Sequence, residues 1–217
     1  MALGERRRTT LVHLSRRGYR AALRAPGLRH AMLLPPVQRL RRALQHPARP
    51  EDVVEVVDLL AAAGIRCWLA GGWGVDALIG RQTRTHADLD LIVEQGDAAA
   101  AESVLAEHGF RLVPESVPGS GHRYAPGAVM PVRVLLQDRA GRVVDLHPVD
   151  VRGWPRLPSV SEGFATGVVA GRAVDCVSVE AQIAGHRGYE LPDRERRDLE
   201  LLERMLATPP DSRRTRA

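Results

Sequence analysis

Several residue types are missing from this 217-residue sequence, and their absence excludes common activities. There is no lysine, and therefore no amine for a Schiff base and no P-loop lysine, and there is no asparagine for N-glycosylation. All 31 basic residues are arginine, so any phosphate must be bound by arginine side chains or by the backbone. No stretch without Asp, Glu or Arg exceeds nine residues, whereas a transmembrane helix needs about 20 mostly apolar ones. The sequence therefore predicts no membrane span.

Cysteine is also scarce. Cys67 and Cys176 are too few for a disulfide framework or a cysteine-based zinc site, and both lie in apolar segments typical of strands. We expect both to be unreactive core residues. The first 17 residues are basic but contain no sustained apolar region, so they do not resemble a secretory signal. A cytoplasmic location is the resulting expectation.

The charge is distributed unevenly along the chain. The net charge of +5 combines +11 in residues 1–49, which hold 12 Arg and one acid, with −6 in residues 50–217. Prolines interrupt residues 1–49, so we expect a basic arm with short helices only, such as 37–44. We expect a domain in 50–150 and, in 151–217, a hairpin followed by a helical segment. The 44% hydrophobic content indicates a folded globular protein.

Hydrophobic periodicity and turn residues predict helices and strands that follow one another along the chain, as in an α/β (α+β) fold. The expected helices are 50–64, 73–79, 97–108, 178–189 and 192–206. The expected strands are 65–70, 89–93, 132–137, 142–147, 166–170 and 173–177, with a long loop over 114–131.

Two acidic residues flank the start of the strand at 89–93. Asp88 and Asp90 are two residues apart, so their carboxylates project from the same face, about 7 Å apart along the strand. Leu89 and Leu91 then face the core. Two neighbouring negative charges favour a divalent cation with oxygen ligands, for which Mg²⁺ is the natural candidate. The alternative is an exposed acidic turn.

A glycine pair precedes this acidic pair in the sequence. Gly71–Gly72 follows a strand and precedes a helix, which presents backbone N–H groups of the kind that bind phosphate. A tight packing turn is the alternative. A phosphate cradle and a carboxylate pair within 20 residues support each other.

A third carboxylate lies in the segment GRVVDLHPVD. Asp145 alternates with Val144 and Leu146, so it points outward or, if its strand neighbours 89–93, joins Asp88 and Asp90. Three acids around a metal suit phosphoryl-type transfer, in which one of them deprotonates the attacking hydroxyl.

The segment GGWGVDALIGRQTRTHADLDL resembles the signature of the antibiotic nucleotidyltransferases of the DNA polymerase β superfamily, lincosamide nucleotidyltransferases and aminoglycoside adenylyltransferases in particular. The resemblance continues in VVDLHPV and in AGRAVDCVSVEAQIAGHRGYEL followed by RDLELL, and it spans roughly residues 50–206. It implies a nucleotidyltransferase fold, in which a small mixed β-sheet backed by helices forms the catalytic domain in 50–150 and the C-terminal segment 151–217 closes the cleft. It also implies that Asp88 and Asp90 bind Mg²⁺, that Asp145 is the third carboxylate and the base, and that Gly71–Gly72 cradle the nucleotide phosphates.

The resemblance also suggests roles for further residues. Arg81 and Arg84 would contact phosphate or support the scaffold. His86 would orient a carboxylate or make a structural hydrogen bond. The candidates for lining the nucleotide or acceptor cleft, with packing as the alternative, are His86, His147, His186 and Tyr189.

The expected activity is transfer of AMP from ATP–Mg²⁺ to a hydroxyl of a small, amine-bearing antibiotic, with release of pyrophosphate. The alternative is a protein that binds nucleic acid or an anionic surface and keeps the scaffold without turnover. It rests on the basic arm, which could bind phosphates in a salt-dependent way or mediate self-association.

Overall fold

The structure is a computed structural model, and it describes residues 46–113, 134–154, 160, 162–186 and 191–207. Pro47 begins one compact unit that contains every described helix and strand, and residues 1–46 form a separate unit. The expected arm, the helix 37–44 and the loop 114–131 lie almost wholly outside the described residues. Within them, no helix has the length and apolarity that crossing a membrane requires.

The described strands form one mixed sheet of seven, in the order β3-β4-β5-β2-β1-β7-β6. The pairs β2–β5 and β1–β7 are parallel, and the other neighbouring pairs are antiparallel. The strands are β1 (Cys67–Leu69), β2 (Leu89–Glu94), β3 (Arg111–Leu112), β4 (Val134–Gln137), β5 (Val143–Val149), β6 (Phe164–Val169) and β7 (Arg172–Val177).

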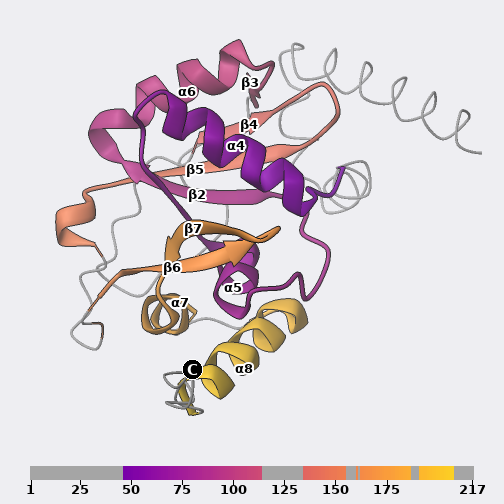
Figure 1. The fold of residues 1–217 in the computed structure, drawn as a ribbon, viewed down its shortest axis with the longest axis vertical. Helices are drawn as coiled ribbons and strands as arrows, with labels where there is room; N and C mark the ends of the chain where they lie inside the picture. The colour runs from indigo at the N-terminus through magenta and orange to yellow at the C-terminus, as the bar shows by residue number, and fades with distance from the viewer. Residues whose placement is uncertain (1–45, 114–133, 155–159, 161, 187–190, 208–217) are drawn as a thin grey trace, which may run out of the picture. The chain divides into compact units, whose positions relative to one another are not determined.

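Helices cover both faces of this sheet (Figure 1). The α-helices are α4 (Pro50–Ala62), α5 (Gly71–Ile79), α6 (Ala98–Glu107), α7 (Val179–Gly185) and α8 (Asp193–Ala207), and short 3-10 turns occupy Gln95–Asp97 and Val151–Gly153. The mixed α/β architecture of the prediction is confirmed.

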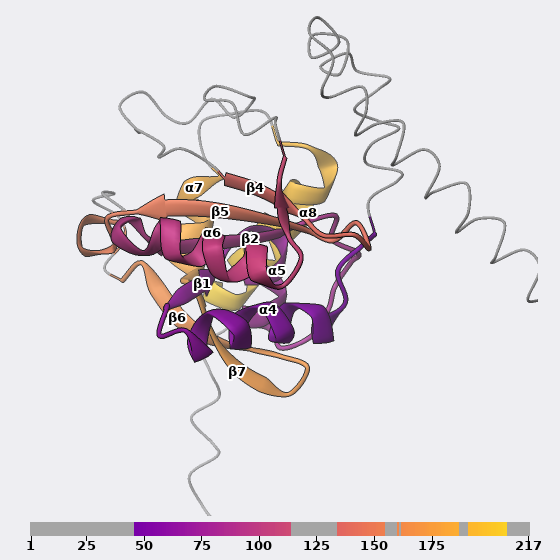
Figure 2. The same ribbon diagram turned by 90° about the horizontal axis from the view of Figure 1, so that it is seen from above.

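One face of the sheet packs on α4 and α6, which lie side by side: α4 contacts β1 and β6, and α6 contacts β2 (Figure 2). The core there joins Leu60 of α4 and Leu105 of α6 to Leu91 and Leu146, all with 0% exposure. Cys67 and Cys176 belong to the same core as buried free thiols, as the sequence predicted. Burial raises the pKa of each thiol to about 12, and the nearby charge of Asp175 adds to the effect.

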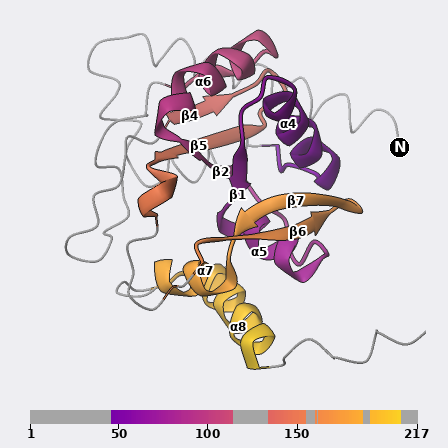
Figure 3. The ribbon, with the colours of Figure 1, turned by 60° about the vertical axis from the view of Figure 1, so that its left-hand side comes forward.

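Helices α5, α7 and α8 form a second layer. Figure 3 shows α7 and α8 together next to α5, where Val75, Ile183 and Leu202 make a separate apolar cluster. Helix α5 also approaches β6 so closely that a side chain on Gly167 would lie 2.5 Å from the Ala77 backbone. Strands β6 and β7 come from the segment 151–217 but belong to the same sheet as the strands of the segment 50–150.

Several expected boundaries were wrong. Helix α5 begins at Gly71 instead of Trp73, because the glycine pair forms its first turn. Strand β6 begins at Phe164, and its turn to β7 lies at Ala170–Gly171, where both residues have positive φ. Strand β3 was not predicted, since only two residues pair with β4.

Other elements are shorter or longer at one end than expected. Helix α4 ends at Ala62, and Gly64 follows with φ +73°. Helix α7 ends at Gly185, where the sequence predicted continuation to residue 189, and residues 187–190 lie outside the described part. Strand β5 extends to Val149 through Pro148.

Candidate active site

Two carboxylates lie opposite each other on neighbouring parallel strands. The register of β2 and β5 pairs Asp90 with Asp145, so the condition under which the sequence joined Asp145 to Asp90, that the two strands are neighbours, is met. Leu91 and Leu146, the next pair in register, are fully buried in the core on the other face. The alternation of the two strands therefore puts both acids on the face away from α4 and α6.

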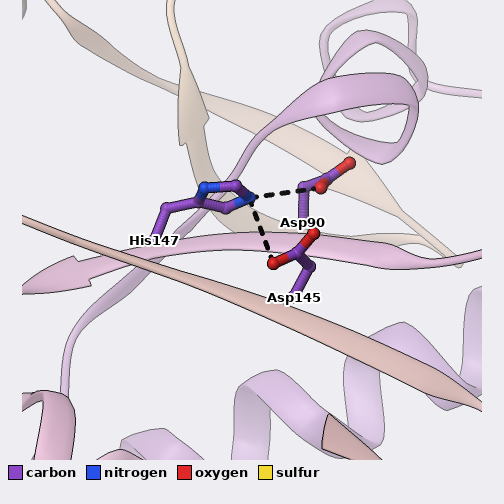
Figure 4. A group of neighbouring side chains, drawn as sticks. All are labelled: Asp90, Asp145 and His147. Carbon is purple, nitrogen blue, oxygen red and sulfur yellow. Dashed lines mark hydrogen bonds and ion pairs between the residues drawn. The ribbon is translucent and has the colours of Figure 1, made fainter. Parts of the chain in front are cut away.

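His147 completes this group (Figure 4). Its Nε2 lies 3.3 Å from Asp90 Oδ1 and 3.6 Å from Asp145 Oδ1. One atom from each of the three residues lies within 4.8 Å of the others, an arrangement that no other His, Cys, Asp or Glu of the described residues joins. Asp145 is 1% exposed, and the other two are partly buried. Two carboxylates and an imidazole offer hard oxygen and borderline nitrogen ligands for a divalent cation.

Asp88 lies outside this group. It is partly buried at the bend before β2 and two residues from Asp90. Its negative charge reaches Arg84, whose pKa it helps to raise. Its expected role as a metal ligand stays a prediction.

The glycine pair lies directly against the site. Gly71 has φ +54°, and a Cβ there would overlap Asp90 Oδ2 and lie 3.0 Å from Asp90 Cγ. Only glycine accommodates both the backbone angle and this contact. The N-terminus of α5, with its partial positive charge, therefore begins beside the Asp90 carboxylate.

The two predicted arginines differ in their surroundings. Arg81 is exposed after the end of α5. Arg84 is held by Asp198 of α8, since its Nε donates to Asp198 Oδ1 over 3.1 Å and its Nη2 to Oδ2 over 2.5 Å. Burial alone would lower the pKa of Arg84, but the hydrogen bonds and charge of Asp198 raise it above the usual arginine value.

The other candidate residues lie in packing positions or outside the described part. His86 is buried, with Nε2 hydrogen-bonded to Asp76 Oδ2 and its ring 4.7 Å from that of Trp73. His186 has its Nδ1 2.7 Å from the carbonyl oxygen of Gln182 at the end of α7. Tyr189 lies outside the described residues.

Sequence reasoning missed three buried polar residues that surround the site: Asp76, Gln182 and Asp198. Gln182 donates from Nε2 to the carbonyl oxygen of Gly71 over 3.3 Å, which connects α7 to the glycine pair. Asp198 lies four residues before Leu202, on the buried face of an amphipathic helix. A lone acid on an apolar stripe is the signal that could have revealed it, since buried charges are almost always paired.

Two solved structures share this architecture. The chain is similar to the lincomycin-bound lincosamide adenylyltransferase LnuA (TM-score 0.59, 23% identity, 73% of this chain and 98% of that chain). It is also similar to ANT(2″)-Ia in complex with adenylyl-2″-tobramycin (TM-score 0.55, 22% identity, 72% and 88%). The fold is that of the nucleotidyltransferases.

The sequence comparison then gives the family. Residues 52–202 match the aminoglycoside-2″-adenylyltransferase family, and the chain belongs to it. Curated relatives include a lincosamide resistance protein of Staphylococcus haemolyticus (25% identity over 163 residues, 70% of this chain and 93% of the relative). Another is a 2″-aminoglycoside nucleotidyltransferase of Escherichia coli (30% over 143 residues, 61% and 71%). The predicted family and the prediction of an enzyme are confirmed.

The match begins at residue 52 and so leaves out the basic arm. Nothing in these comparisons supports the alternative of an anionic partner or of self-association through residues 1–49.

Proposed function

We propose that this enzyme transfers AMP from ATP to a hydroxyl group of an amine-bearing antibiotic of the lincosamide or aminoglycoside class, with release of pyrophosphate. The observation that carries the proposal is the register of Asp90 with Asp145 beside the glycine pair at the start of α5. It puts a negatively charged pair next to a backbone turn suited to phosphate.

The side chains at this site are suitable ligands for a divalent cation. Asp90 and Asp145 repel each other on one face of the sheet, and a cation between them would offset that repulsion. Asp90, Asp145 and, at the strand entrance, Asp88 are the oxygen donors that would hold Mg²⁺, and His147 would contribute nitrogen or orient its neighbours. When bound, Mg²⁺ would neutralise charge on the phosphates of ATP.

The chain's own residues supply the remaining steps. Backbone N–H groups at Gly71 and Gly72 would bind phosphate oxygens, with the exposed Arg81 as a further contact. The acceptor hydroxyl oxygen would attack the α-phosphorus, and the bond from that phosphorus to the oxygen of pyrophosphate would break. Asp145 would take the hydroxyl proton, because it is the more deeply buried carboxylate of the pair.

The acceptor class follows from the relatives and from charge. The named relatives act on lincosamides or aminoglycosides, and residues 50–217 carry a net charge of −6, which favours a cationic acceptor. His186 and Tyr189 stay candidates for the acceptor cleft, and a cytoplasmic location stays a prediction.

Mass spectrometry of a mixed lincosamide and aminoglycoside panel, incubated with ATP, Mg²⁺ and the full chain, tests the proposal. We expect one or more antibiotics to gain a single AMP, with stoichiometric pyrophosphate. The Asp90→Asn variant should give no product, whereas Glu107→Gln, an exposed change on α6, should match the wild type. Gain of a phosphate instead of AMP, or ATP hydrolysis without a modified antibiotic, would contradict the proposal.

A further inference from the structure

The segment between α5 and β2, residues 80–88, joins the glycine-pair helix to the strand that carries Asp90. Two buried carboxylates from different helices hold this linker: Asp76 on α5 and Asp198 on α8, which are 2% and 3% exposed. Neither belongs to the group of Asp90, Asp145 and His147.

Asp76 makes the first contact with the linker. Its Oδ1 accepts hydrogen bonds from the backbone N–H of Thr83 over 3.1 Å and from the Thr83 hydroxyl over 2.5 Å. Its Oδ2 pairs with His86 Nε2. Because one buried carboxylate binds two linker residues, neither Thr83 nor His86 moves without loss of a buried hydrogen bond.

Asp198 makes the second contact with the linker, from a helix more than a hundred residues away in sequence. Both of its oxygens accept from Arg84, in the two-pronged geometry that fixes a guanidinium in orientation as well as in position. Arg84 Nη1 also donates to the carbonyl oxygen of Thr85 over 3.4 Å. The guanidinium is thus directed along the linker.

The two held side chains meet at Gly72. A Cβ on this glycine would overlap His86 Nδ1 and would lie 2.5 Å from His86 Cε1 and 2.6 Å from Arg84 Nη2. Gly71, one residue earlier, touches the Asp90 carboxylate in the same way. The glycine pair is therefore enclosed between the linker on one side and Asp90 on the other.

We propose that Asp76 and Asp198 are positioning residues, which hold His86 and Arg84 against Gly72 and so fix the glycine pair beside Asp90 in the form that binds ATP. The inference rests on the proposed function and extends it to the C-terminal helix. The inference also decides between phosphate contact and scaffold support, the two roles open to Arg84. The guanidinium supports the turn, and backbone N–H groups bind the phosphate. A displacement of about 1 Å at a reacting centre can cost 10²-fold in rate, so support of this kind is functional.

The test uses the full chain and the isosteric variant Asp198→Asn. We expect its affinity for a non-hydrolysable ATP analogue with Mg²⁺, measured by calorimetry, to fall by about tenfold or more, the scale for a lost supporting partner. Asp198→Glu, which keeps the carboxylate, should recover part of the affinity. Asp193→Asn, on the same helix with a side chain 90% exposed, is the matched control and should bind like the wild type.

The same variant distinguishes the two roles of Arg84. If Arg84 itself bound phosphate, removal of its competing carboxylate would leave the affinity for ATP unchanged or increase it. Either result would overturn the inference. Should Asp198→Asn not fold, Arg84→Lys takes its place in a hydrogen-exchange comparison without nucleotide, since it keeps the charge but loses the two-pronged contact, and the inference requires faster exchange at residues 74–77 from it.

Hydrogen exchange without nucleotide gives a readout that does not depend on the proposed function. We expect the amides of residues 74–77, beginning with Gly74, whose N–H donates to the Ala70 carbonyl oxygen, to exchange faster in Asp198→Asn than in the wild type, while those of residues 53–60 in α4 stay protected. Equal exchange at 74–77 would overturn the inference. If the wild type bound no ATP, the proposed function would fail, and the exchange comparison would still decide whether Asp198 fixes the turn.

Discussion

Around the site, the two faces of strands β2 and β5 differ in polarity, although they share the same backbone. One face presents fully buried leucines to α4 and α6, and the other presents Asp90, Asp145 and His147. The apolar face determines the register, because a slip by one residue would turn the leucines away from the core. That register is what puts Asp90 opposite Asp145, so the core face positions the chemical face without taking part in the chemistry.

The largest effect should come from Asp90→Ala, which removes a carboxylate from the polar face. We expect AMP transfer to fall by on the order of 10³-fold, the scale for loss of one charge-stabilising group. The melting temperature should stay the same or rise, since the change relieves repulsion with Asp145.

Turnover and thermal unfolding of Asp90→Ala, with Asp193→Ala as the exposed control, check this expectation. Near-normal turnover would remove Asp90 from the site. A large fall in melting temperature would show that the polar face also stabilises the fold.

Leu146→Ala, on the apolar face, should mainly lower the stability of the fold. Leu146 lies between Asp145 and His147 in sequence but is fully buried on the other face. Its truncation should lower the free energy of unfolding by about 2–5 kcal/mol, as for other buried leucines. Urea unfolding followed by circular dichroism measures this change. A loss under 1 kcal/mol would mean that the core face does not fix the register.

A smaller effect concerns the thiols on the core face. Burial, and secondarily the charge of Asp175, raises the pKa of Cys67 and Cys176 from 9.0 to about 12. The folded state therefore keeps both protons where the unfolded chain loses them. This contribution to stability is complete below pH 9 and is lost as the pH rises towards 12.

Iodoacetamide labelling at pH 8 should accordingly be slow in the native protein and fast in urea. A Cys67→Ser, Cys176→Ser double variant should lose less stability between pH 9 and pH 11 than the wild type. Rapid native labelling of either thiol would contradict the burial of that core.

Arg66→Ala should have the smallest effect. Arg66 pairs with Asp175 over 2.7 Å, but its side chain is 68% exposed, so solvent screens the pair. We expect a destabilisation of about 0.2–1 kcal/mol, measured by urea unfolding, and no change in turnover. A loss of several kcal/mol would show that this ion pair between β1 and β7 matters as much as the leucine face.

The local patterns predicted most of the fold. Alternating residues such as Leu89 and Leu91 identify β2 and its buried face without reference to any other segment. The two-residue strand β3 has no such pattern, because its pairing with β4 determines it. The strands expected from the sequence put the next turn at residues 171–172, whereas the structure has it at Ala170–Gly171. Alanine rarely adopts positive φ, so Ala170 gives no turn signal.

The site was predictable to the extent that its residues are neighbours in sequence. Asp90, Asp145 and the glycine pair were found from spacing and motif. The contact of Asp198 with Arg84 joins residues 114 positions apart, which no local pattern encodes. On the last helix, Asp198 is buried where it pairs with Arg84 of the linker, whereas Leu206, next to the C-terminal end of the helix, is 50% exposed.

The most direct test of the division between the two faces is turnover per folded molecule for two adjacent conservative variants, Asp145→Asn and Leu146→Val. Asparagine fills the same space as aspartate but cannot accept the acceptor's proton, so turnover should fall by about 10²–10⁴-fold with a smaller loss of ATP affinity. Leu146→Val should keep wild-type turnover once the rate is corrected for the fraction folded. Equal losses in the two variants, or a greater loss in Leu146→Val, would contradict the account.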